Sequence, residues 1–103
     1  MSFAKRGAAE VVTICESADI SGGVEKEVGN YRRWTLYIHA DGAIDITIQL
    51  SPDGVNWYEP DESPISFSAA GDKVIEMGYD AYKIKLTGSN TTAVTAQIRG
   101  VFG

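Results

Sequence analysis

Residues 34–58 read WTLYIHADGAIDITIQLSPDGVNWY and predict two long strands and the start of a third. Apolar residues fall at every second position of both long strands, which is the period of a strand with one buried face. The predicted buried row consists of Trp34, Leu36, Ile38, Ile44, Ile46, Ile48 and Leu50. One face of each strand therefore belongs to the core, and the other meets water or a partner.

Two tight turns are predicted to join these strands. A three-residue loop at 40–42, with Gly42 in the left-handed conformation, would place Ile38 opposite Ile44 in a hairpin. Such a hairpin keeps both apolar rows on one face of the sheet. A second turn at residues 51–54, Ser-Pro-Asp-Gly, has proline and glycine at the positions that a type I turn favours.

The rest of the chain predicts further short strands. They are the β-branched segment 11–15, the charged segment 24–28, and the alternating segments 65–68, 73–77, 82–86 and 94–98. The charges of segment 24–28 suit a sheet edge. The last two segments are expected to form a second hairpin, adding Ile84, Leu86, Val94 and Ile98 to the core. About eight strands without a helix indicate an all-β fold, an antiparallel β-sandwich with jelly-roll connections.

Length and composition limit the organisation and the partners. The 103 residues suffice for one sandwich domain at 11–103, preceded by an N-terminal arm at 1–10 that lacks periodicity. The net charge of −5 disfavours nucleic acid, and no apolar run is long enough to span a membrane. With a single cysteine and no secretory leader, we expect synthesis in a reducing cytoplasm.

Few residues indicate chemistry. His39 is the only histidine, which excludes histidine-dependent triads and two-histidine metal sites, and it is expected on an outward strand face. Cys15, in an apolar strand, is interpreted as a small buried hydrophobic residue rather than a nucleophile. The loop carboxylates are interpreted as a solvated acidic rim rather than a calcium site: Asp53, Glu59, Asp61 and Glu62. We therefore expect no catalysis, no metal and no cofactor.

Trp57 and Tyr58 are the candidate exposed contacts of the rim. Adjacent residues of a strand face opposite sides, so one of these aromatics belongs to the core and the other to the surface. The exposed one is interpreted first as an ordinary rim residue, and the alternative is that it stacks on a sugar or anchors a protein contact. The sequence leaves open which of the two is exposed.

Three segments resemble discoidin-type jelly rolls. Residues 48–58, IQLSPDGVNWY, resemble the strand-turn-strand signature of that family. Residues 81–86, AYKIKL, and 97–103, QIRGVFG, are similar to its penultimate stretch and its closing strand. The resemblance implies a jelly roll that binds carbohydrate or lipid.

The same Asp-Gly-x-Asn-Trp turn also resembles bacteriophage virion proteins, in particular capsid decoration or cement proteins. That resemblance implies a compact jelly roll, often a trimer, whose N-terminal arm grips the major capsid protein. Phe3 would be the apolar anchor of the arm, and Lys5 and Arg6 would complement an acidic shell surface. We therefore expect a structural protein of the virion, on the outer surface of a phage head and made in the bacterial cytoplasm. A small carbohydrate-binding module and a tail or baseplate component remain the alternatives, with a glycan as the less favoured partner.

Overall fold

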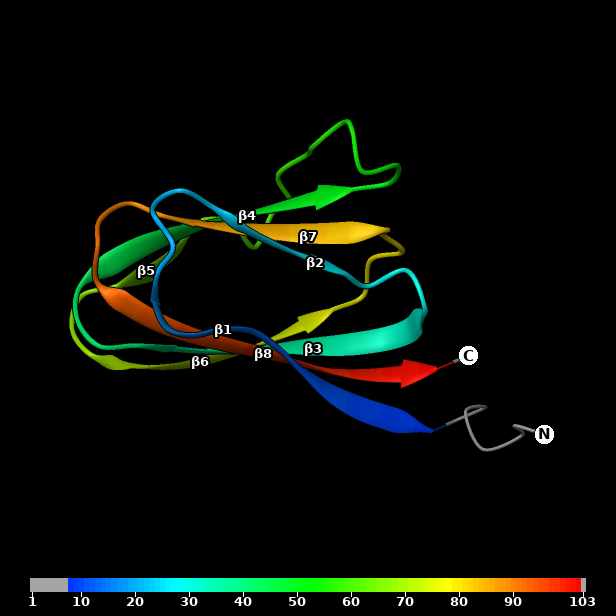
Figure 1. The fold of residues 1–103 in the computed structure, drawn as a ribbon, viewed down its shortest axis with the longest axis horizontal. Helices are drawn as coiled ribbons and strands as arrows, with labels where there is room; N and C mark the ends of the chain where they lie inside the picture. Colours follow the sequence, from blue (N-terminus) through cyan, green and yellow to red (C-terminus); the bar gives the residue numbers. More distant parts are fainter. Residues whose placement is uncertain (1–7, 103) are drawn as a thin grey trace.

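The computed structural model describes residues 8–102, which form eight strands and no helix (Figure 1). The strands are β1 (Ala9–Asp19), β2 (Val24–Glu27), β3 (Tyr31–Ala40), β4 (Ile44–Ser51), β5 (Ile65–Phe67), β6 (Gly71–Met77), β7 (Lys83–Gly88) and β8 (Ala93–Phe102). The predicted all-β class is confirmed. None of the described residues belongs to a helix that could cross a membrane.

The strands form two antiparallel four-stranded sheets that pack face to face. The first sheet has the order β1-β8-β3-β6 and the second has the order β2-β7-β4-β5. Figure 1 shows them as two layers, with the first sheet below and the second above. Every connection except the one between β4 and β5 crosses from one sheet to the other, which makes the sandwich a jelly roll as predicted. The charged strand β2 lies at a sheet edge, also as predicted.

The core lies between the sheets and consists of alternate residues of both. Every residue predicted to be buried is buried, with exposed fractions between 0% and the 8% of Leu50. Ile20 and Val28, which follow β1 and β2, are also buried but were not among the predicted core residues. The backbone oxygen of Ile20 accepts hydrogen bonds from the amides of Gly23 and Gly88, which fixes the turn that leads to β2.

The two predicted hairpins are wrong. Strands β3 and β4 lie in opposite sheets, and so do β7 and β8. A crossing between facing sheets keeps both apolar rows on the core side just as a hairpin does, so alternation cannot distinguish the two. Nor does Gly42 adopt the left-handed conformation, because among the described glycines only Gly23 and Gly54 have positive φ.

The first strand starts earlier than predicted. Ala9 pairs with Val101 and Glu10 with Gly100, because β8 extends to Phe102 and offers partners for both. The amide of Phe102 also donates to the backbone oxygen of Ala8, at 2.9 Å. The sandwich therefore begins at Ala9 rather than at residue 11. The predicted arm contacts Phe3, Lys5 and Arg6 lie outside the described residues.

Candidate functional site

Tyr58, not Trp57, is the exposed aromatic of the loop that connects β4 to β5. Its side chain is 63% exposed, and its backbone forms two hydrogen bonds with Leu50 of β4. Trp57 is half-buried, and Nζ of Lys85 in β7 lies 4.2 Å from its ring centroid. The tryptophan thus packs against the second sheet through a cation–π contact, while Tyr58 remains available to a partner.

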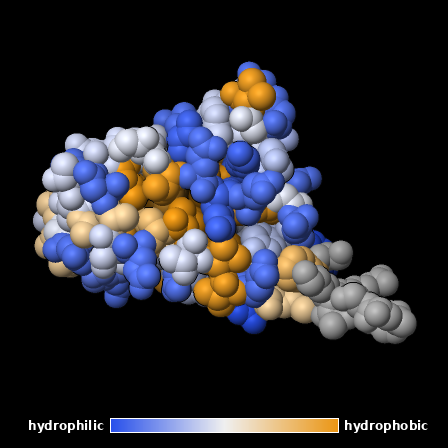
Figure 2. All heavy atoms as spheres, in the orientation of Figure 1, coloured by the Kyte–Doolittle hydropathy of each residue, from blue (hydrophilic) through white to orange (hydrophobic). Residues whose placement is uncertain are grey.

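Asp53 organises the tip of this loop. Its carboxylate accepts hydrogen bonds from the backbone amides of Val55 and Asn56, both at 2.8 Å, and from the side-chain amide of Asn56 at 2.7 Å. These hydrogen bonds favour the ionised form and lower the pKa of Asp53 to about 2. The amides of residues 55 and 56 are consequently unavailable to β4, so the loop is longer than the predicted four-residue turn. Val55 is 78% exposed, and Figure 2 shows apolar surface at the tip.

The Asp-Gly-x-Asn-Trp motif is therefore explained by the loop itself. Asp53 accepts the hydrogen bonds, Gly54 supplies a φ of +82°, and Asn56 donates to Asp53. A side chain at residue 54 would also approach the ring of Tyr82, to 3.1 Å. Each member of the motif has a structural role.

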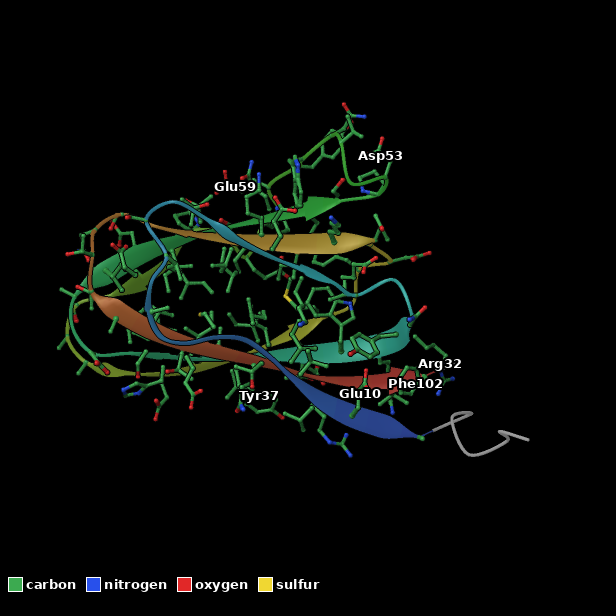
Figure 3. All side chains as sticks on the ribbon, viewed as in Figure 1. Glu10, Arg32, Tyr37, Asp53, Glu59 and Phe102 are labelled. Atoms are coloured by element: carbon green, nitrogen blue, oxygen red, sulfur yellow. The ribbon has the colours of Figure 1, made fainter. Side chains whose placement is uncertain are left out.

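Two of the other loop carboxylates, Glu59 and Glu62, are also engaged locally. Glu59 accepts the hydroxyl of Ser63 at 2.7 Å, and Glu62 accepts that of Tyr79 at 2.6 Å. Figure 3 shows Asp53 and Glu59 on the loop that rises from the second sheet. Within residues 8–102, no group of histidine, cysteine and carboxylate side chains is arranged to hold a metal ion.

Tyr58 and Tyr79 border a shallow pocket of about 230 Å³ at the end of the second sheet. Pro60 and Asp80 also line it. We call this surface the aromatic rim. Tyr58 was one of the two aromatics predicted at the rim, whereas Tyr79 was not predicted because it comes from the connection between β6 and β7 and is brought close by the fold.

Cys15 is buried, as predicted. Its side chain is 8% exposed, and Sγ donates to the backbone oxygen of Val94 at 3.4 Å. Desolvation raises the pKa of the thiol, which reduces the thiolate fraction that a nucleophile requires.

His39 lies on the outer face of the first sheet, between two carboxylates. Nδ1 lies 2.6 Å from Asp72 Oδ1, and Nε2 lies 3.0 Å from Asp41 Oδ1. Both ring nitrogens can donate only in the imidazolium form. The hydrogen bond to Asp72, followed by that to Asp41, raises the pKa of His39 above its ordinary value.

We predict that this pKa is lowered toward about 6.5 by Asp72→Asn, because an amide does not favour the imidazolium as a carboxylate does. The elevated pKa means that the interaction stabilises the fold fully below the unfolded-state pKa. The stabilisation is lost as the pH rises through the folded-state pKa. An NMR titration measures the pKa of His39 without ambiguity, since His39 is the only histidine. Asp45→Asn is the control, and a native pKa of His39 at or below about 6.5 would contradict the geometry.

The outer face of the first sheet carries a groove that the sequence analysis did not identify. Its volume is about 520 Å³, and its lining includes Arg33, Thr35, Tyr37, Glu76 and Arg99. We call it the outer groove. Alternation placed Thr35 and Tyr37 of β3 on an outward face, but only the pairing of β3 with β6 and β8 brings Glu76 and Arg99 beside them.

No protein-family model and no curated protein matches the chain. Solved structures do match its fold. YomS, a protein derived from the SPBc2 prophage, aligns with a TM-score of 0.66 and 15% identity, over 91% of this chain and 93% of that chain. A structure from Bacillus endospore appendages aligns at 0.56 and 11%, over 93% and 88% of the two chains. A family 29 carbohydrate-binding module aligns at 0.50 and 12%, over 93% of each. At these identities the similarity shows a shared jelly-roll fold.

Proposed function

We propose that this chain is a non-enzymatic structural protein of a phage virion, which binds the outer surface of the head and stabilises it. The proposal includes a homo-oligomer, a trimer, whose N-terminal residues grip the major capsid protein. The observation that carries it is that residues 9–102 by themselves form eight strands in two sheets around a common core. The proposal assigns residues 1–7 to the contact with the capsid.

The position of the first strand supports this assignment. The amide of Phe102 donates to Ala8, so the chain enters the sandwich beside the end of its last strand. Seven residues span at most about 25 Å when extended, enough to reach a neighbouring subunit. Burial of Phe3 would contribute about 1.5–3 kcal/mol per copy, and an oligomer combines several such contacts.

Two further observations agree with a structural role. Two side chains that could react or bind a ligand contribute to the fold instead. Cys15 is buried, and Asp53 accepts hydrogen bonds from the amides of its own loop. The matching fold of the prophage-derived protein YomS extends over nearly the whole of both chains, which is consistent with a phage origin.

Sedimentation with undecorated phage heads tests the proposal. The full chain is expected to co-sediment with heads, and deletion of residues 2–7 is expected to abolish or sharply weaken this binding. The deletion ends before Ala9 because that residue pairs with Val101, so the melting curve of the free protein should stay nearly unchanged.

The substitutions Phe3→Ala and Lys5→Gln/Arg6→Gln separate the apolar anchor from the charges. If the truncated protein binds heads as well as the full chain does, residues 2–7 do not bind the capsid, and the interface lies on the sandwich itself. Co-sedimentation with purified tails but not with heads would instead assign the chain to the tail or baseplate.

A further inference from the structure

The outer groove exists because the short side chain of Thr35 lies among longer side chains of β3, β6 and β8. Thr35 of β3 pairs with Arg99 of β8 on one side and with Glu76 of β6 on the other. Neighbouring strands lie about 4.8 Å apart, so the backbones of Arg99 and Glu76 are separated by about 10 Å across the floor at Thr35. Tyr37 lines one end of the groove, two residues further along β3.

The other end of the groove is positively charged and open. Arg33 lies two residues before Thr35 on β3, so that two arginines line one cavity. Gly78, at this end, has no side chain, and a Cβ built on it would contact nothing within 4 Å. A ligand longer than the groove could therefore extend past Gly78.

Neither arginine of the groove has an ion-pair partner among residues 8–102. Of the lysines and arginines within residues 8–102, only Lys83 forms an ion pair, with Glu25 at 3.6 Å. A guanidinium presents several donors in a planar fork, which matches a carboxylate in two hydrogen bonds. The two arginines thus provide a site for an anionic group.

Tyr37 and Glu76 define the rest of the ligand. Tyr37 is 41% exposed, and Figure 3 shows it on the side of the first sheet that faces away from the second. Its ring offers an apolar platform with a polar tip. Glu76 and Thr35 offer acceptors for hydroxyl groups. A ligand that satisfies all of these groups has a carboxylate at one side, hydroxyls at the other and a flat apolar face between them.

We propose that the outer groove binds an acidic saccharide of the uronic acid class. Its carboxylate binds Arg33 and Arg99, a sugar ring stacks on Tyr37, and a hydroxyl donates to Glu76. The volume of about 520 Å³ lies within the range of small-ligand sites. This assignment goes beyond the proposed decoration role and does not depend on it.

An acidic polypeptide fits the groove less well. Strand β3 lies between β8 and β6, so its backbone groups are already paired and a peptide cannot add to it as a strand. A segment with carboxylates on both sides would also place one of them against Glu76, whereas a saccharide presents neutral hydroxyls there.

Titration of the full chain with defined ligands, followed by NMR and calorimetry, tests the proposal. The acidic probes are a galacturonate tetramer and a mannuronate tetramer; the neutral probe is the galactose tetramer. At least one acidic probe is expected to bind and to shift the signals of the groove. The neutral tetramer should bind about tenfold or more weakly than the galacturonate tetramer if the latter binds, since it lacks the charge-assisted hydrogen bonds.

Variants separate the two halves of the site. Arg99→Gln and Arg33→Gln should each reduce affinity for the acidic probe about tenfold and leave neutral binding unchanged, whereas Tyr37→Ala should weaken both. Arg32→Gln is the matched control, because Arg32 is a neighbouring exposed arginine outside the groove lining. The proposal is overturned if no acidic probe binds saturably, if Arg32→Gln has the same effect, or if a glutamate tetrapeptide binds more tightly than every saccharide.

Discussion

Ile46→Ala is expected to lower the free energy of unfolding by about 2–5 kcal/mol, measured by urea denaturation. Ile46 is 0% exposed and lies on β4 between Ile65 of β5 and Gly88 of β7. Its truncation leaves a cavity, and Gly88 has no side chain that could move into it. The cost is therefore expected in the upper half of this range.

Two variants of the same strand are the controls. Ile46→Val removes a single methyl group and should cost only about 0.5–1.5 kcal/mol. Gln49→Ala, on the outward side of β4, should change stability by less than about 0.5 kcal/mol. A loss below about 1 kcal/mol for Ile46→Ala would mean that the inward row contributes less to stability than its burial indicates.

The sequence was sufficient to identify which residues are buried, but not which strands pair. Ile38 and Ile44 both point into the core, and their alternation alone shows this. Whether β3 pairs with β4 depends on the direction in which the chain leaves residues 41–43, and alternation contains no information on that direction. In the structure the amide of Asp41 donates to the backbone oxygen of Ala93, which ties this crossing to the one between β7 and β8.

The candidate sites also differ in whether they could be predicted without the strand pairing. The pair Trp57 and Tyr58 was predicted from local sequence, because two adjacent aromatics after a turn place one ring outside, but only the structure shows that the exposed ring is that of Tyr58. The outer groove was not predicted, because Thr35, Glu76 and Arg99 become neighbours only when β3 lies between β6 and β8. Sites that are assembled across strands require the strand order, which alternation along the sequence does not show.

Gly100→Val is expected to destabilise the protein by about 3 kcal/mol, at the upper end of the cost of overpacking. A Cβ built on Gly100 would overlap the ring of Tyr31 at several carbon atoms, including one near the base of the side chain. That ring cannot easily move, because its hydroxyl donates to Glu10 at 2.7 Å and its centroid lies 5.5 Å from that of Phe102.

Strand propensity predicts the opposite sign for this substitution, since valine is favoured over glycine in strands on a scale that spans about 1 kcal/mol. The steric cost is larger, so the net effect should be a loss of stability in urea denaturation. Removal of the ring should then relieve the clash: in a Tyr31→Ala background, Gly100→Val should cost about 0.5–3 kcal/mol less than in the native chain. If its cost is the same in both backgrounds, the overlap with Tyr31 is not the cause. A gain in stability in the native chain would show that strand propensity dominates at Gly100.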